Sequence, residues 1–172
     1  MPAITAARAA LFVVAACAAV LGGALLFQYV GGYHPCALCY AQRWPFYLAI
    51  ALSILVLSLV NDPGAHRATA GLLVVIALVF AGGAVLAFYH VGVEQQWWPG
   101  TNACGGAGIR STGVSLEDLR KRLLDQPIVR CDRPAWTLFG ISLAGFNVAI
   151  SAGLAVVTAW FARTVARRGA PA

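Results

Sequence analysis

Apolar residues occur along this chain in long runs that contain almost no charge. Four of these runs approach the roughly 20 residues that a helix needs to cross about 30 Å of hydrocarbon. They cover approximately residues 9–29, 44–60, 68–89 and 141–162. The second run is the shortest, and an Asn-Asp-Pro-Gly turn follows it. The pattern predicts four transmembrane helices.

The composition favours the same interpretation. Of the 172 residues, 60% are hydrophobic and only 10% are charged, whereas a soluble domain carries about 25% charged residues. One soluble core could not bury this apolar excess, and intrinsic disorder requires the opposite composition. We therefore predict an all-α integral membrane protein, in which residues 1–172 form a four-helix bundle as a single membrane domain.

The net charge of +6 reflects 12 Lys and Arg residues against 6 Asp and Glu residues. In a soluble protein this excess would suggest nucleic-acid binding. Here the basic residues are dispersed and lie largely at the borders of the apolar runs. We interpret them as charges that set the topology, and we expect membrane lipid rather than nucleic acid around the protein.

An even number of helices places both termini on one side of the membrane. The two tails and the turn after the second helix are rich in arginine, which indicates the cytoplasmic side. These arginines are Arg8, Arg67, Arg163, Arg167 and Arg168. The loops at approximately 30–43 and 90–140 are then a short and a long periplasmic loop. Arg130 and Arg133, close to the fourth helix, weigh against this orientation, whereas the cysteines favour it.

Cys17 differs from the other cysteines because it lies inside the first apolar run. The stretch Val14-Ala15-Ala16-Cys17 is similar to a lipoprotein cleavage box. However, the chain stays apolar well beyond Cys17, where a mature lipoprotein would turn polar. We expect Cys17 to be a small apolar packing residue.

The remaining four cysteines all fall in the two predicted periplasmic loops, in a compartment where disulfides persist. Cys36 and Cys39 form a C-x-x-C pair, a spacing that is commonly redox-active because the pKa of one thiol is lowered. If Cys36 lies at a helix N-terminus, the helix dipole would stabilise its thiolate. Arg43 would add a fixed positive charge nearby, although a salt bridge or lipid headgroup contact also explains an arginine there.

Cys104 and Cys131 lie in the long loop, next to glycine-rich and charged residues. We expect both to be on flexible, exposed chain, accessible to a thiol of another protein. Between them, Ser115-Leu-Glu-Asp118 predicts a short capped helix, which would lie on the membrane surface or pack on the bundle. The pairing of the four cysteines stays open, because three connectivities are possible.

A structural zinc site and a pair of inert disulfides are alternative roles for these cysteines. A structural zinc site usually takes two closely spaced ligand pairs, but this sequence has only one, so we expect no metal. Two inert disulfides would also explain four cysteines, although a small membrane bundle does not obviously need them. Tyr89, Trp97 and Trp98 are more typical of an interfacial aromatic belt than of a ligand pocket.

Three sequence motifs together resemble the DsbB family of bacterial inner-membrane disulfide-generating proteins. They are Cys36-Ala-Leu-Cys39-Tyr-Ala-Gln-Arg43 after the first helix, Tyr89-His90 at the end of the third, and Cys131-x-x-x-x-Trp136 before the fourth. The similarity extends through all four helices.

The resemblance implies a relay of two cysteine pairs. A reduced periplasmic thioredoxin-like oxidase of DsbA type would attack a Cys104–Cys131 disulfide and form a mixed disulfide with Cys104. Exchange would then reduce Cys36–Cys39, and Cys39 would pass electrons to a quinone of the respiratory pool. Arg43 and His90 would lie beside that quinone, which is ubiquinone or menaquinone. A flavin is disfavoured because no G-x-G-x-x-G follows a strand.

Two rival functions remain at this stage. In a vitamin K epoxide reductase-like protein the C-x-x-C follows the loop pair on the last core helix, whereas here it precedes that pair. A non-catalytic quinone-binding membrane subunit would carry its disulfides for stability only. Replacing Cys39 by Ser separates these readings, because an enzyme loses turnover whereas a structural subunit loses folding or binding.

Overall fold

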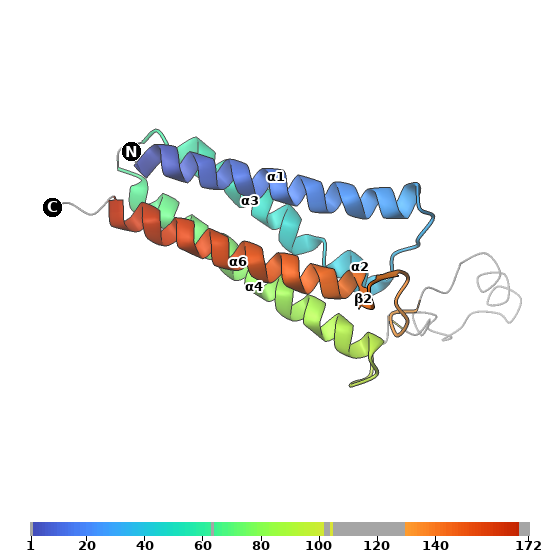
Figure 1. Cartoon of the computed structure of the whole chain (residues 1–172). Helices are drawn as coiled ribbons and strands as arrows, with labels where there is room; N and C mark the ends of the chain where they lie inside the picture. The colour runs from blue at the N-terminus through green and yellow to red at the C-terminus, as the bar shows by residue number, and fades with distance from the viewer. Residues whose placement is uncertain (1, 63, 102–103, 105–129, 169–172) are drawn as a thin grey trace, which may run out of the picture.

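Four long helices run side by side and make up most of the protein (Figure 1). The computed structural model describes residues 2–62, 64–101, 104 and 130–168. In this part of the chain the long helices are α1 (Pro2–Tyr29), α3 (Trp44–Leu59), α4 (His66–Glu94) and α6 (Leu143–Arg168). A short helix, α2 (Ala37–Ala41), precedes α3, and the strands β1 (Thr137–Leu138) and β2 (Ile141–Ser142) precede α6.

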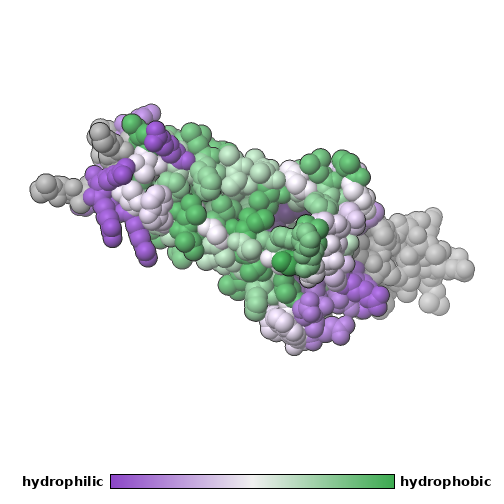
Figure 2. Space-filling view, in the orientation of Figure 1, coloured by the Kyte–Doolittle hydropathy of each residue, from purple (hydrophilic) through white to green (hydrophobic). Residues whose placement is uncertain are grey.

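The helices form a bundle in which each packs on two neighbours. The pair α4 and α6 has the most extensive contact, and α1 with α3, α3 with α4 and α1 with α6 complete the ring. Within the described residues, four helical segments are long and apolar enough to cross a membrane, α2 and α3 counting as one. In Figure 2 a largely hydrophobic middle separates two hydrophilic ends. The prediction of an all-α four-helix membrane protein is confirmed.

The apolar side chains on the outside of the bundle agree with a lipid surrounding. Leu26, Ile54, Leu78 and Val156 are all more than half exposed. Inside, Phe46 packs on Phe80 with ring centroids 5.9 Å apart. The same buried cluster contains Cys17, so the prediction that Cys17 is a packing residue is confirmed.

The ends of the helices differ from the predicted ranges where the loops fold back. The third predicted helix continues past residue 89 to Glu94. The fourth was predicted from residue 141, but Ile141 pairs with Leu138 in a two-stranded hairpin, and α6 begins at Leu143. Phe139 and Gly140, at the turn, have positive φ angles of 52° and 78°, as a tight hairpin requires.

A sharp reversal after α4 returns the chain to the end of the bundle. Gln96 has a φ of 60°, and Trp98 lies back on α4, stacked on Tyr89 with ring centroids 5.9 Å apart. The Trp98 indole N–H donates to the Tyr89 carbonyl at 2.9 Å. Gly92 allows this approach, because a Cβ there would overlap the Trp98 ring. The reversal brings Cys104 to the end of the bundle that carries α2.

The predicted capped helix at Ser115–Asp118 lies outside the described residues.

Candidate active site

The C-x-x-C pair lies where an extended segment enters α2. Cys36 is the N-cap residue of this helix, and its Sγ accepts a hydrogen bond from the Cys39 backbone N–H at 3.3 Å. The helical turn places the two Sγ atoms 3.0 Å apart, and both cysteines are free. Cys36 is buried, whereas Cys39 is partly exposed. The helix N-terminus that the sequence suggested for Cys36 is therefore present.

Cys104 and Cys131 form a disulfide, with Cα atoms 5.0 Å apart. Its two cysteines are only 5% and 0% exposed. The expectation that both lie on exposed chain is therefore wrong. The reversal after α4 packs them against Cys36, Leu38 and Val93 in a second hydrophobic cluster, separate from the main core.

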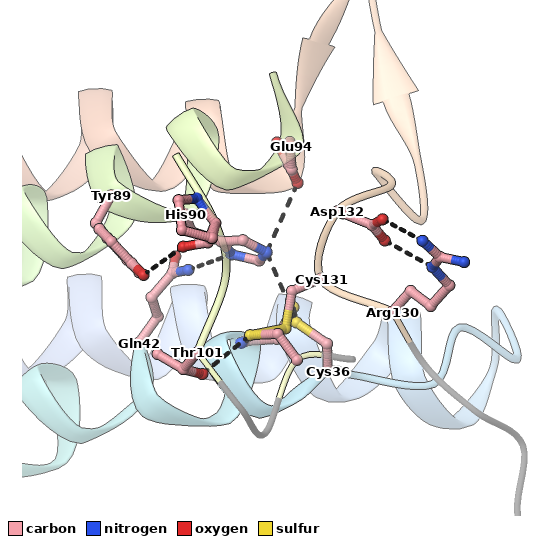
Figure 3. The surroundings of a disulfide bond; sticks show 12 residues. Cys36, Gln42, Tyr89, His90, Glu94, Thr101, Arg130, Cys131 and Asp132 are labelled. Carbon is pink, nitrogen blue, oxygen red and sulfur yellow. Dashed lines mark hydrogen bonds and ion pairs between the residues drawn. A yellow bond between two sulfur atoms is a disulfide. The ribbon is translucent and has the colours of Figure 1, made fainter. Parts of the chain in front are cut away.

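The disulfide and the free thiol pair are thus neighbours (Figure 3). Cys36 belongs to the same buried cluster as both disulfide cysteines, and Cys39 packs at the edge of that cluster. Residues from three separate parts of the sequence therefore bring all four loop cysteines together. An apolar surrounding of this kind keeps water away from thiols and favours exchange between them over side reactions.

A chain of hydrogen-bonded polar side chains leads from α6 to Cys36 inside the bundle. The Ser151 hydroxyl donates to the Asn147 amide oxygen at 3.1 Å, and the Asn147 amide nitrogen donates to Gln42 Oε1 at 2.5 Å. Gln42 Nε2 lies 2.6 Å from His90 Nδ1. With the Gln42 amide donating, Nδ1 is the acceptor, and Nε2 carries the ring proton and lies 3.7 Å from Cys36 Sγ.

These contacts stabilise the Cys36 thiolate. The pKa of Cys36 is lowered, chiefly by the hydrogen bond with the Cys39 thiol, and next by the hydrogen bond from the His90 ring and by the Cys39 backbone N–H. Burial opposes this effect, because a low-dielectric surrounding disfavours the charged form. A lowered thiol pKa is the property that sequence analysis expected from the C-x-x-C spacing.

Glu94 lies one helical turn after His90 on α4. Its Oε1 is 3.9 Å from His90 Nε2, and its side chain is only 5% exposed. Ser142 approaches the carboxyl group, but Oε2 has no hydrogen-bond partner among the described residues. A buried carboxyl oxygen without a partner is costly, and such groups occur at functional sites.

A cavity of about 440 Å³ opens beside Cys39, between α1, α6 and the residues that connect α2 to α3. Its size is typical of small-molecule sites. Cys39, Arg43 and His90, three of the residues that the sequence suggested, line it together with Gln42 and Asn147. Figure 2 shows a hollow in the surface near the loop-bearing end of the bundle.

Polar groups in this cavity are few and stand among apolar walls. Arg43 ends the short connection into α3, and its guanidinium carbon lies 5.0 Å from the centroid of the Tyr40 ring. Gln28 Oε1, buried at the cavity, has no hydrogen-bond partner among the described residues. The cavity therefore offers the Arg43 cation and amide N–H groups as hydrogen-bond donors to a ligand with polar oxygens and an apolar body.

Tyr89, Trp97 and Trp98 do not line this cavity. They stack on one another and on Phe88 at the end of α4. They are therefore not contacts of a ligand in this cavity, and their place in an interfacial aromatic belt stays a prediction.

Several polar residues of the site received no role in the sequence analysis, among them Gln28, Gln42, Glu94 and Asn147. Gln28 near the end of the first apolar run and Asn147 inside the fourth are polar residues in apolar surroundings, where a buried polar side chain suggests function by its cost alone. Gln42 lies within the motif that runs from Cys36 to Arg43, and this position next to the redox cysteines could have indicated a role for it.

The comparisons with known proteins agree with one another. The family model "Disulfide bond formation protein DsbB" matches residues 6–161. A disulfide bond formation protein B of Azoarcus sp. is 33% identical over 159 residues, which cover 87% of this chain and 88% of that protein. The protein of the same name from Methylococcus capsulatus is 33% identical over 141 residues, with 80% and 82% covered. No solved structure matched the chain.

Proposed function

We propose a specific reaction for this chain, which belongs to the DsbB family of disulfide bond formation proteins. Membership makes it an oxidoreductase of disulfide bond formation, and its four long apolar helices make it a multi-pass membrane protein. The proposed reaction is the reoxidation of a reduced DsbA-type dithiol protein. Two electrons pass through two cysteine pairs to a membrane quinone.

One observation carries this proposal: the two thiols of the C-x-x-C pair face different surroundings. Cys36 is buried in the cluster that contains the Cys104–Cys131 disulfide, and Cys39 lines the cavity of about 440 Å³. A pair that touches a disulfide on one side and a ligand cavity on the other is suited to pass electrons between them. A purely structural pair would not need either contact.

The first proposed steps are thiol–disulfide exchanges. The partner's dithiol reduces Cys104–Cys131, forming its own disulfide and leaving two thiols. A thiolate of the loop pair then attacks Cys36–Cys39, so that the loop disulfide forms again and the C-x-x-C pair is reduced. A thiol with a lowered pKa is a good leaving group in exchange, which suits Cys36.

The cavity fits a quinone head group. Arg43 and the Gln28, Gln42 and Asn147 amides would hold its oxygens, and the apolar walls from α1 and α6 would surround its ring. When bound, a quinone supplies a two-electron, two-proton acceptor. His90 lies at the cavity with its Nε2 toward Cys36, where it can hold or move a proton as the thiols are oxidised.

The proposed location is the bacterial inner membrane. The α2 end of the bundle would face the periplasm, where the cysteines meet the dithiol partner, and the termini would be cytoplasmic. The respiratory chain would reoxidise the quinol.

A direct test follows quinone absorbance anaerobically. Purified protein is mixed with a reduced thioredoxin-fold dithiol protein and ubiquinone or menaquinone. We expect one quinone to be consumed per dithiol, and no consumption with Cys39→Ser. Cys17→Ala, which changes a cysteine of the main core, should retain turnover. A folded protein that consumes neither quinone would overturn the proposal and favour a non-catalytic subunit.

A further inference from the structure

We propose that the reduced Cys36–Cys39 pair, together with His90 and Glu94, forms a binding site for a thiophilic divalent cation such as Zn²⁺. The site differs from a zinc site made by the four loop cysteines, because it uses one cysteine pair and two residues of α4. It requires only that the pair be reduced, and it does not depend on the electron route proposed above.

The donor atoms are already close to the geometry of a metal site. The two thiol sulfurs and His90 Nε2 lie within 4.8 Å of one another. Cys36 Sγ is 3.0 Å from Cys39 Sγ and 3.7 Å from His90 Nε2. In tetrahedral zinc, bond lengths of about 2.3 Å to sulfur and 2.0 Å to nitrogen separate two sulfurs by about 3.8 Å, and sulfur from nitrogen by about 3.5 Å. The sulfur–nitrogen pair nearly fits, and the sulfurs must separate by less than about 1 Å.

Glu94 provides an independent indication of a cation. Its side chain is 5% exposed, and Oε2 has no hydrogen-bond partner among the described residues. Oε1 lies 3.9 Å from His90 Nε2, whereas oxygen and nitrogen ligands of one tetrahedral zinc ion are about 3.3 Å apart. A small movement of this side chain supplies a fourth ligand. The metal would then give a partner to the Glu94 carboxyl group, whose Oε2 has none among the described residues.

The residues behind His90 fit this role as well. A metal on Nε2 requires the ring proton on Nδ1, where zinc-binding histidines usually donate to an oxygen. Gln42 meets this need if its amide is turned, so that Oε1 faces Nδ1. Asn147 then turns in the same way, and the Ser151 hydroxyl accepts from it instead of donating. All three contacts are kept, because each of these groups is both a donor and an acceptor.

Binding is an acid–base reaction without electron transfer. The thiols release their protons to solvent as both sulfurs bind the cation, and the pair stays reduced. Two thiolates and an imidazole select borderline or soft cations over Mg²⁺ and Ca²⁺, which prefer oxygen ligands. A disulfide between Cys36 and Cys39 has no thiolate to offer. The cation therefore holds the protein in its dithiol state and slows its reoxidation.

The test measures Zn²⁺ binding to the Cys104→Ser/Cys131→Ser protein, whose reduced C-x-x-C pair is the only loop pair left. Reduced protein is titrated anaerobically against a chromophoric zinc chelator. We expect one Zn²⁺ per chain, no binding after the pair is oxidised, and no competition from Mg²⁺. With Co²⁺ as the probe, we expect thiolate-to-metal charge-transfer absorption and the visible bands of a tetrahedral site.

Variants separate a built site from simple chelation by two thiols. We expect His90→Ala and Glu94→Gln each to weaken Zn²⁺ binding by about 10- to 100-fold. Asp132→Asn, which also removes one carboxylate but lies in an exposed ion pair with Arg130, should leave binding unchanged. Equal affinity in all three variants, or equal binding by the oxidised protein, would overturn the proposal. Because the readout is equilibrium binding, its failure is distinct from a failure of quinone turnover.

Discussion

Gln42 and His90, 48 residues apart in sequence, are joined by a hydrogen bond of 2.6 Å between the amide nitrogen and ring Nδ1. This bond belongs to a chain in which every donor points the same way, from Ser151 through Asn147 and Gln42 to His90. The last N–H of the chain points to Cys36 Sγ. Aligned hydrogen bonds polarise one another. Residues of α6 therefore contribute to the ionisation of the Cys36 thiol at the start of α2.

Replacing Gln42 by Leu should break this chain. His90 Nδ1 and the Asn147 amide lose their partner in a buried place, and a buried group without a partner costs about 1–3 kcal/mol. We expect lower stability in detergent and at least a tenfold loss of quinone-dependent turnover. Thermal unfolding and quinone absorbance measure the two effects. Gln95→Leu, at the exposed end of α4, is the matched control, and equal turnover in both variants would contradict a role for the chain.

The Cys36 thiol should ionise below the ordinary cysteine pKa of about 8.5. In a reduced protein that carries Cys17→Ala, Cys104→Ser and Cys131→Ser, the first thiolate to absorb in the ultraviolet should be that of Cys36. The lowered pKa stabilises the folded reduced protein at pH above the ordinary value, and this contribution is lost as pH falls through the folded value.

Two further variants test the causes of that shift. Cys39→Ala removes the main hydrogen-bond donor to Cys36, and His90→Phe removes the second. Each variant should move the first inflection of the thiolate absorbance titration to higher pH, with the larger change for Cys39→Ala. Cys36→Ser should abolish the thiolate absorbance at low pH. An inflection that stays in place in both His90→Phe and Cys39→Ala would refute the assignment.

Gly92→Ala should displace Trp98 from α4, because the new methyl group would overlap the indole ring. The chain reversal that brings Cys104 to Cys36 then loses its main contact. We expect changed tryptophan fluorescence and slower reduction of the loop disulfide by a dithiol partner. Gly82→Ala, on the same helix with open space around its Cβ, should be neutral or stabilise by up to about 1 kcal/mol. Similar behaviour of the two variants would show that Trp98 packing is not required.

The double variant Cys104→Ser/Cys131→Ser should separate the two halves of the relay. Chemically reduced beforehand, it should still deliver one pair of electrons to ubiquinone in a single turnover. It should not be reduced by the dithiol partner, so multiple turnovers fail. Stopped-flow measurement of quinone absorbance distinguishes single turnover from multiple turnover. Full multiple turnover without these cysteines would mean that the partner reduces Cys36–Cys39 directly.

The helices were predictable because an uncharged apolar run of about 20 residues has the length of a helix that crosses a bilayer. Cys36, Cys39, Arg43 and His90 lie at one site as the motifs suggested, since three of them belong to one short string. The burial of Cys104 was not predictable. It depends on the positive φ at Gln96 and on Trp98 lying over Gly92, and neither a turn type nor a contact of this kind has a clear sequence pattern.

The amide partners of His90 were missed for another reason. Asn147 reaches Gln42 across 105 residues, and only the packing of α6 beside the start of α3 brings them together. A lone asparagine in an apolar run indicates that a partner exists, but not which residue it is. Glu94 was missed because the predicted third helix ended at residue 89, which left this carboxylate in a loop.

All four loop cysteines and His90 lie at the α2 end of the bundle, while α1 begins and α6 ends at the other (Figure 1). Moving one charge across a membrane costs or yields about 2.3 kcal/mol per 100 mV of membrane potential. In the proposed reaction electrons and protons leave the thiols together, near one face of the bilayer. In the proposed reaction no net charge then crosses the membrane field, so this transfer itself neither generates nor opposes a voltage.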